Sequence, residues 1–402
     1  MNCPICRSQE KEIILNLNCG GFDFSPLYRK IKIESCLSCG HIFNDLSDKE
    51  IKGLYEYYNN EYSLINISNR GKKGDLPGSS NIFTENRFNN LYNDVKPYLK
   101  TGFNILDIGC AMGGYLNFLK DKGFNNLYGV DTIQSYIEIA RESGGYDIRY
   151  GNAEILPYED NFFDFINIDQ VLEHLVYPQK AFKEARRILK DGGIFCVSVP
   201  DAYRYPDFYF FDFYWFLLRE HIQHFDIRHL KILGSIYGFE IVDFFQTANP
   251  SMSEKMIFPN LCVIFKLNKK IKKISKTKKS SFLLKKNIIQ YVKSEKNKLK
   301  DKKNKIKDNI SFKTPVYVWG IGREFFYLYE NSNIKQCNII GLIDSNTYKR
   351  DFLTVNGKKI INPLILESAS FDSILIISAI AHIEEIKNNV RIIDFKGKIM
   401  EF

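Results

Sequence analysis

A strand, a glycine-bearing turn and a helix follow one another from Asn104 to Lys120 and constrain the fold more than any other feature of the chain. The apolar run ending at Asp107 has the composition of a buried strand, and glycines follow at positions 109 and 113. Such a loop can bring backbone amides against a ligand at a helix N-terminus. A second apolar run, Leu127–Asp131, ends in an acid that could accept two ribose hydroxyls. The pattern predicts a doubly wound α/β fold.

The glycine spacing differs from the G-x-G-x-x-G of dinucleotide-binding folds. Asp-x-Gly-x-x-x-Gly instead resembles motif I of the class I S-adenosylmethionine (SAM) methyltransferases. Gly151–Pro157 is similar to that family's adenine-contacting loop, with Asn152 in place of the usual Asp, and Asp169–Leu175 is similar to its fourth motif. The resemblance implies SAM as cofactor. The cofactor-contacting residues that it implies are Asp107, Gly109, Gly113, Asp131, Asn152, Ala153 and Asp169.

In this resemblance Gly109 and Gly113 approach the methionine part of SAM and Asp131 holds the ribose. Asn152 and Ala153 meet the adenine, and the side-chain oxygen of Asn152 could accept a hydrogen bond from the adenine amino group. The competing interpretation is another Rossmann-like fold with glycines at these positions by chance. The motifs named above stand in the family's order, which favours the methyltransferase.

Four of the nine cysteines form two C-x-x-C pairs. Cys3 and Cys6 make one pair, and Cys36 and Cys39 make the other. Two such thiolate pairs complete a tetrahedral zinc site, and a site closed by four thiolates leaves no open position for catalysis. We therefore expect structural zinc; the alternative is four reduced thiols that bind no metal.

The composition predicts a globular protein of two or three domains, since 402 residues with 45 % hydrophobic content are ample for buried cores. No apolar segment follows a basic start, and no apolar run reaches the roughly 18–20 residues that span a bilayer. We expect a cytoplasmic protein without a membrane span.

The segment from Lys266 to Lys313 carries 19 lysines against three acids. Apolar residues recur at helical spacing over about 284–310, which predicts an amphipathic linker helix. Contact with nucleic acid or an acidic membrane is the alternative, but few aromatic residues interleave the lysines. We expect a solvated linker and no nucleic-acid partner.

A second strand-and-helix pattern follows the linker. Pro315–Trp319 and Asn338–Ile343 read as strands, separated by a two-glycine loop and a helix from about Arg323 to Glu330. Asp344 stands where a ribose-binding acid would. A further strand is expected at Ser373–Ser378, followed by a helix near 382–388 and the apolar run Arg391–Phe395. The sequence leaves open whether this small Rossmann-like domain binds a nucleotide or only packs against the first domain.

The resulting plan is a zinc module over residues 1–45, a helical connector over 46–100, a SAM domain over 101–265, a linker over 266–313 and a Rossmann-like domain over 314–402. This plan resembles the sugar C-methyltransferases, which act on nucleotide-linked deoxy-keto sugars. The resemblance implies a nucleotide-linked sugar as substrate, in surface-polysaccharide or deoxysugar biosynthesis. It leaves the sugar, the nucleotide and the oligomeric state open.

In that family a Glu-His pair lies at the active site with the His as base, and the matching residues here are Glu220 and His221. Transfer of a methyl group to carbon requires loss of a proton beside a keto group, and His is a suitable base near neutral pH. Neighbouring residues on a helix diverge, so the pair must lie in a loop or at a helix start. His174, His224 and Tyr62 are further candidates for substrate contact.

Other functions remain open from the sequence. His221 and His224 could simply pack or cap a helix. Two departures from the family pattern, Leu218 in place of a Tyr and the absence of a late glycine-rich segment, leave O- or N-methylation of another small acceptor possible. A binding factor that uses zinc and lysines, or a non-catalytic assembly protein that retains SAM, are the remaining alternatives.

Overall fold

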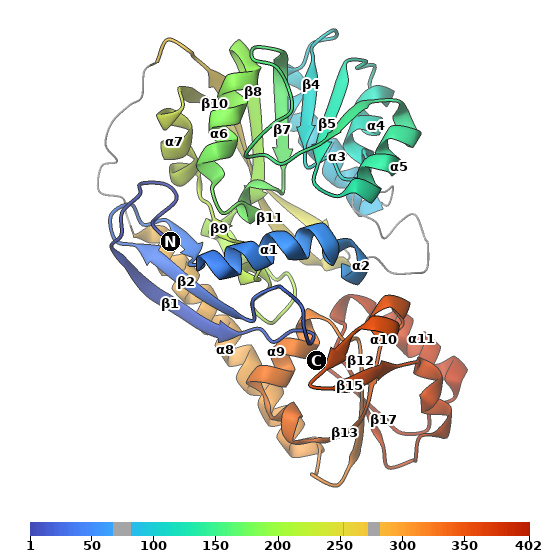
Figure 1. The fold of residues 1–402 in the computed structure, drawn as a ribbon. Helices are drawn as coiled ribbons and strands as arrows, with labels where there is room; N and C mark the ends of the chain where they lie inside the picture. The colour runs from blue at the N-terminus through green and yellow to red at the C-terminus, as the bar shows by residue number, and fades with distance from the viewer. Residues whose placement is uncertain (67–81, 252, 272–281) are drawn as a thin grey trace.

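The computed structural model describes residues 1–66, 82–251, 253–271 and 282–402, which form three sheets joined by helices (Figure 1). The seven-stranded sheet stands at one end of the molecule and the six-stranded sheet at the other (Figure 1). The four-stranded N-terminal sheet lies between them on one side (Figure 1). The expected α/β architecture with a second, smaller sheet domain is confirmed.

The seven-stranded sheet has the order β10-β11-β8-β7-β4-β5-β6. Strands β4 to β8 run parallel, and β11 joins β8 antiparallel. Helices α3, α4 and α5 pack on one face, while α6 and α7 pack on the other, so the sheet is doubly wound. The strands are β4 (Ile105–Ile108), β5 (Leu127–Asp131), β6 (Asp147–Tyr150), β7 (Phe163–Asp169), β8 (Leu189–Pro200), β10 (Phe239–Ser251) and β11 (Ser253–Leu267).

The helices of this unit begin where the sequence provides starts. Pro178 occupies the first turn of α6 (Pro178–Ile188), where its missing N–H costs no hydrogen bond. Asp226 caps α7 (Ile227–Ile236) through the His229 amide. The remaining helices are α3 (Ile82–Val95), η2 (Lys96–Tyr98), α4 (Gly114–Asp121), α5 (Gln134–Gly144), and the short η3 (Leu172–His174), η4 (Ala202–Asp207) and η5 (Trp215–Leu217).

The N-terminal sheet combines β1 (Lys11–Asn18), β2 (Lys30–Cys36) and β3 (Ile42–Asn44) with β9 (Gln223–His224). Strand β9 belongs to the SAM-domain part of the chain and pairs antiparallel with β3, so the cysteine module is bonded to the segment after His221. Helix α1 (Asp48–Asn60) follows, opened by a Ser47–Glu50 capping box, and α2 (Tyr62–Asn66) comes next.

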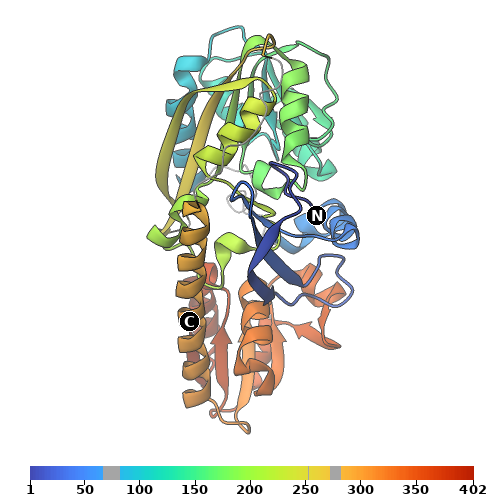
Figure 2. The same cartoon turned by 90° about the vertical axis from the view of Figure 1, so that its left-hand side faces the viewer.

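The predicted linker helix is present as α8 (Leu283–Asn309), which runs the length of the lower half of the molecule (Figure 2). Its apolar side is buried through Ile288 and Val292, among others. Lys302 pairs with Asp212 at 2.6 Å, and Tyr291 accepts the Phe216 amide at 3.2 Å. The helix is therefore a strut between the domains rather than a free basic arm.

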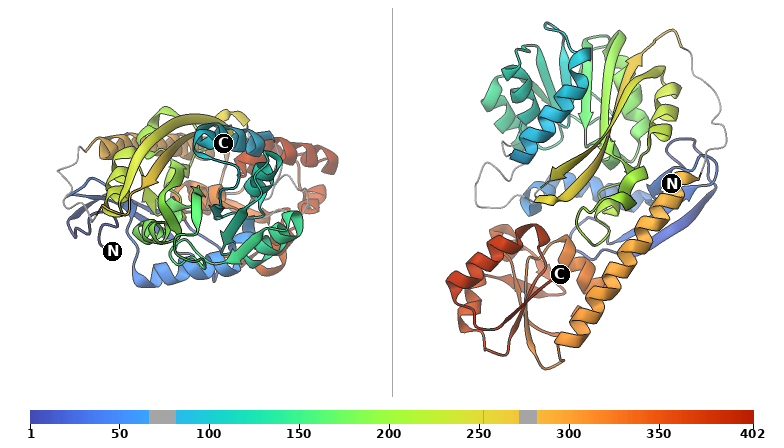
Figure 3. Two further views of the ribbon diagram at one scale, coloured as in Figure 1. Left: turned by 90° about the horizontal axis from the view of Figure 1, so that it is seen from above. Right: turned by 180° about the vertical axis from the view of Figure 1, so that it is seen from behind.

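The six-stranded sheet has the order β14-β15-β13-β12-β16-β17, with parallel pairs around β12 and β13. It belongs to the C-terminal domain, drawn in orange and red in Figure 3, right. The apolar run Arg391–Phe395 does not add a strand, because α11 continues to Ile393 and the last strand follows it. The elements are β12 (Pro315–Trp319), α9 (Arg323–Asn331), η6 (Asn333–Gln336), β13 (Asn338–Ile343), α10 (Thr347–Phe352), β14 (Thr354–Val355), β15 (Lys358–Ile361), η7 (Pro363–Ser368), β16 (Ile374–Ile377), η8 (Ile380–His382), α11 (Ile383–Ile393) and β17 (Lys398–Glu401). Among the helices of the described ranges, none has the length and apolar character needed to cross a bilayer.

Candidate active site

One large cavity, of about 1390 Å³, opens where the strand ends of the two larger sheets face each other. Asp107, Asp131 and Asp169 line it from the carboxyl ends of β4, β5 and β7. Gly320 and Asp344 line it from the loops after β12 and β13 of the C-terminal domain. Ligands of open α/β sheets bind at such carboxyl ends. The cavity therefore joins two such ends in a single space.

The turn after β4 has the close-approach geometry predicted from its glycines. Gly109 has φ +76°, and a Cβ atom there would lie 2.4 Å from Val171 Cγ2, so only glycine fits. Gly113 also has positive φ and precedes α4, but it packs against Ala140 and is not among the residues that line the cavity. Its role is to turn the chain into the helix.

Asp107 is buried beneath this turn. It accepts a hydrogen bond from Asn167 Nδ2 at 2.7 Å, and burial raises its pKa to about 7. Asp131 is placed by the loop itself: its Oδ2 accepts the Ala111 amide and its Oδ1 the Ile133 amide, both at 2.9 Å. Burial raises the pKa of Asp131 as well. Both acids therefore shape the pocket as well as face it.

The adenine-contacting loop differs from expectation at Asn152. Its side-chain oxygen accepts the amides of Glu154 at 2.9 Å and Ile155 at 3.1 Å. Because an amide oxygen has two lone pairs, no site on that oxygen remains for an adenine amino group. Asn152 and Ala153 still line the cavity, so their contribution is the shape of the loop.

His221 and His174 line the cavity with ring centroids 5.0 Å apart. The His221 Nδ1 lies 3.1 Å from the Phe216 carbonyl, and the His174 Nδ1 lies 2.8 Å from the Glu220 carbonyl. A carbonyl only accepts, so each Nδ1 carries a proton and each neutral ring keeps a lone pair on Nε2. Burial, and for His221 also the neighbouring His174, holds the pKa of both imidazoles below the usual value. Both rings are thus neutral acceptors at pH 7.

Glu220 and His221 lie in a turn between η5 and β9, as the proposed pairing requires, but their side chains do not meet. The Glu220 carboxylate contacts the Tyr57 hydroxyl and the Arg323 guanidinium, each at 3.5 Å. Burial opposes its ionisation, but the charges of Arg323 and Arg219 outweigh this and keep its pKa below the ordinary value. His221 is oriented by a backbone carbonyl instead of the expected carboxylate.

The other candidates for substrate contact divide. Tyr62 lines the cavity together with His174. His224 does not: it lies on β9, fully buried, with its ring against Tyr205. Burial lowers the pKa of His224 to about 3, so it is a neutral packing residue. The alternative was that His221 and His224 both pack or cap a helix; His224 packs, whereas His221 lines the cavity.

Two arginines that the sequence did not single out border the cavity. Arg323, at the start of α9, stacks its guanidinium on Trp215 at 4.3 Å while reaching Glu220. Arg87, on α3, pairs with Asp169 at 3.6 Å. Only tertiary contacts reveal Arg323, which lies about a hundred residues beyond its partner Glu220. The two-glycine loop that precedes Arg323 was the available signal.

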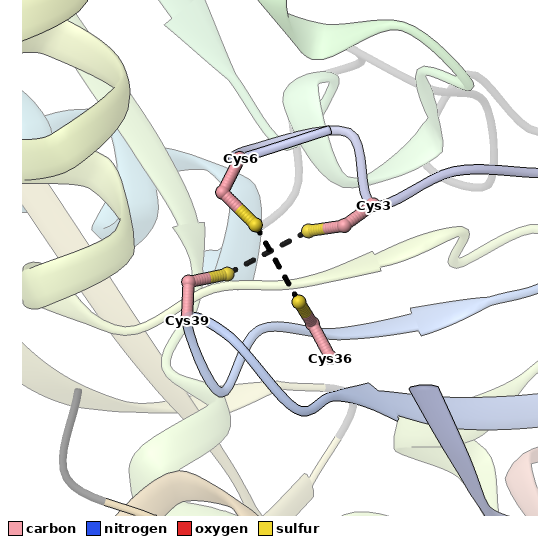
Figure 4. Close-up of side chains that lie close together, drawn as sticks. All are labelled: Cys3, Cys6, Cys36 and Cys39. Atoms are coloured by element: carbon pink, nitrogen blue, oxygen red, sulfur yellow. Dashed lines mark hydrogen bonds between the residues drawn. The ribbon is translucent and has the colours of Figure 1, made fainter. Parts of the chain in front are cut away.

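The four cysteines converge on one point, as Figure 4 shows. The Sγ atoms of Cys3 and Cys39 are 3.6 Å apart, and those of Cys6 and Cys36 are 3.5 Å apart. Four thiolates at 2.3 Å from a tetrahedral zinc lie about 3.8 Å from one another, so the set fits the ion. The second C-x-x-C turn is held to the SAM domain, because His229 Nε2 lies 3.0 Å from the Cys39 carbonyl.

Comparison with known proteins agrees with the fold. A family model described as a methyltransferase domain matches residues 81–243, and one described as C2185-like, N-terminal matches residues 312–400. An uncharacterized protein of Methanocaldococcus jannaschii is 32 % identical over 162 residues, covering 39 % of this chain and 68 % of that protein. An uncharacterized methyltransferase of Schizosaccharomyces pombe is 33 % identical over 117 residues, covering 26 % of this chain and 42 % of that protein.

A probable SAM-dependent methyltransferase of Mycolicibacterium smegmatis is 32 % identical over 101 residues, covering 25 % of this chain and 39 % of that protein. Several curated relatives are thus matched over less than half of their own length. The methyltransferase family model covers the part of the chain that carries the glycine turn and the acids at the strand ends. The central domain, residues 81–243, thus matches the methyltransferase domain family, and its sheet has the Rossmann-like fold of SAM-dependent methyltransferases.

Proposed function

We propose that this protein transfers the methyl group of SAM to a nucleotide-linked sugar. The observation that carries the proposal is the shared cavity, lined by strand ends of both the SAM domain and the C-terminal domain. A cofactor at the β4–β5 end leaves the opposite wall for an acceptor. An acceptor with its own nucleotide would use both walls, whereas a small acceptor would leave the C-terminal wall empty.

The C-terminal wall is suited to a nucleoside diphosphate. Asp344 Oδ2 accepts the Ile321 amide at 2.9 Å, the same arrangement as Asp131 with Ala111 in the SAM domain. Arg323 and Lys349 are cations of this wall, held by Glu220 at 3.5 Å and by Asp344 at 3.0 Å respectively. Arginine binds phosphate in a bidentate manner, and glycine loops let phosphate approach the backbone. We place the nucleotide of the acceptor here and its sugar toward His221.

We propose carbon as the methylated atom and His221 as the base. Bound SAM supplies an electrophilic methyl group on its sulfonium. The His221 Nε2 lone pair would accept the proton from the carbon beside the sugar's keto group. The electron pair of that C–H bond would form the bond to the methyl carbon while the methyl–sulfur bond breaks, its electron pair going to sulfur and S-adenosylhomocysteine leaving. The proton leaves later to solvent. Glu220 holds Arg323 at the rim and orients His174 through its backbone carbonyl.

We propose structural zinc at the four cysteines. The Sγ spacing and the burial of Cys3, Cys36 and Cys39 fit a closed thiolate site. The ion would hold the two turns that carry these cysteines, and through β3 and β9 it would support the turn bearing His221.

The test is S-adenosylhomocysteine release with a panel of nucleotide-linked sugars, each offered in keto and reduced form. Turnover that requires the keto form is expected. Turnover with reduced forms would instead assign a hydroxyl acceptor, for which the same histidines could serve as base. Turnover only with acceptors that lack a nucleotide would contradict the proposal.

A further inference from the structure

A buried carboxyl group and a second imidazole converge on the proposed base. Glu173, His174 and His221 each bring one polar side-chain atom to this cluster, and these atoms all lie within 4.8 Å of one another. Glu173 is only 1 % exposed, and within the described ranges neither of its carboxylate oxygens has a hydrogen-bond partner. Burying a carboxylate without a hydrogen-bond partner costs free energy. The ionised group therefore requires a positive charge beside it, either a transient one such as an imidazolium or a permanent one such as a bound cation.

We propose that Glu173 is a positioning residue that supplies the counter-charge for His221 when this imidazole is protonated, with His174 as the third member of the cluster. The inference rests on the proposed function for the origin of the proton. The His174 Nε2 lies 3.8 Å from Glu173 Oε1, and the Ile222 amide donates to the Glu173 carbonyl at 2.8 Å. These contacts fix η3 against the turn that carries His221.

The chemistry explains why a carboxylate is needed. Proton transfer from the acceptor carbon to His221 Nε2 creates an imidazolium in a buried site, where burial and His174 both disfavour that charge. Glu220, the acid expected from the sequence, is already paired with Arg323. Without an ionised Glu173, proton transfer to His221 changes the net charge of the cluster from zero to +1. With Glu173 ionised, the net charge changes from −1 to zero, which a poorly solvated site tolerates better.

The counter-charge that Glu173 supplies to His221 depends on pH, because it requires the ionised carboxylate. Burial raises its pKa to about 8, with Asp169 adding to the increase and Arg87 opposing it. Glu173 is therefore largely protonated at pH 6 and ionised at pH 9. The other titratable or charged groups facing the cluster are Tyr58 on α1, Tyr205 on η4, Glu220 in the turn, His224 on β9 and Arg323 on α9.

The first test is the pH profile of turnover with the best acceptor from the panel. The rate of the wild-type enzyme should rise with pH through a midpoint near pH 8, as Glu173 ionises, and level off above about pH 9. Glu173→Gln should lower kcat at pH 9 by about 10- to 100-fold with little change in the KM of SAM or of the acceptor. The rise of the rate with pH should vanish in this variant. A Glu173→Gln enzyme that keeps both the limb and the rate would overturn the proposal.

A stability measurement separates this role from a structural one. Because neither Glu173 oxygen has a hydrogen-bond partner among the described residues, Glu173→Met should leave the melting temperature unchanged or raise it while turnover is lost. Glu295 is a matched control, since it is equally buried but binds Lys298 and the Tyr214 amide, and Glu295→Met should lower the melting temperature. Loss of both stability and activity in Glu173→Met would show a structural role.

A third readout does not depend on the acceptor. The chain has six histidines, so the His174 and His221 imidazole signals can be assigned by substitution in a histidine-labelled sample. Their shifts should step as the pH passes about 8 in the wild type and not in Glu173→Gln. A step that persists in the variant contradicts the inference even if no sugar is ever a substrate. A second bound metal equivalent that Glu173→Gln removes would assign the cluster to a cation instead.

Discussion

Asp131 shows how a single side chain organises the cofactor side of the cavity. Its two oxygens hold the amides of Ala111 and Ile133, so the loops after β4 and β5 are tied to one carboxylate that also faces the space where a ribose would lie. Burial raises its pKa, which reflects a polar group kept from water by the loops that it binds. The geometry of both loops and any contact with the ligand therefore depend on the same two carboxylate oxygens.

We expect Asp131→Ala to weaken SAM binding by about 1.5–3 kcal/mol, the usual contribution of charge-assisted hydrogen bonds. Isothermal titration with SAM measures it. Asp131→Asn should fall between the wild type and the Ala variant, because it keeps an acceptor without the charge. Unchanged affinity in the Ala variant would remove Asp131 from the cofactor site.

At this scale the sequence predicted acids at strand ends well, because a strand end is a local feature. Asp107, Asp131 and Asp169 all line the cavity as expected. The sequence-based prediction failed for residues whose contacts depend on the folded chain. Asn152 was expected to meet adenine but caps its own turn, and Glu220 was expected to orient His221 but meets Arg323, more than a hundred positions along the chain.

At the scale of elements, the two residues of β9 connect the cysteine module to the proposed base. Gln223 and His224 pair with Phe43 and Ile42 of β3, and His221 lies just before them. Asp226, which caps α7, also contacts His229, whose other nitrogen lies at the Cys39 carbonyl. The C-x-x-C spacing predicted the cluster itself, whereas the contact with β9 follows only from the folded sheet.

Removal of the metal should therefore affect activity as well as the N-terminal sheet. We expect Cys36→Ser to abolish stoichiometric zinc, lower the melting temperature and reduce turnover, since structural zinc sites contribute folding energy directly. Zinc content and thermal unfolding check this. Cys337→Ser is the control, because Cys337 is a half-buried cysteine of the C-terminal domain outside the cluster. A Cys36→Ser protein with full zinc content would contradict the assignment.

At the scale of the molecule, two Rossmann-like units face each other across one cavity, with α8 as a strut and the N-terminal sheet beside them (Figures 1 and 2). Each unit was predictable from its own strands and glycine turns. The facing arrangement was not, since it depends on side chains such as Arg323 and Trp215 that meet only in the folded chain.

Arg323 should report on the acceptor and not on the cofactor. We expect Arg323→Ala to raise the acceptor KM at least about tenfold and leave SAM affinity unchanged, because the residue belongs to the C-terminal wall. Arg323→Lys should restore only part of the acceptor affinity, because lysine stacks less well on Trp215 and cannot bind a phosphate in a bidentate manner. Arg391→Ala, on an exposed residue of α11 away from the cavity, is the control. A change in SAM affinity alone would contradict this division.

The central claim is that His221 removes a proton from a carbon beside a keto group. It is tested most directly by incubating the keto sugar nucleotide with the enzyme and S-adenosylhomocysteine in deuterium oxide. With no methyl group to transfer, the wild type should exchange that proton for deuterium, as seen by NMR. His221→Ala should not exchange it, while binding SAM normally. Absence of exchange in the wild type, or equal exchange in the variant, would contradict the account.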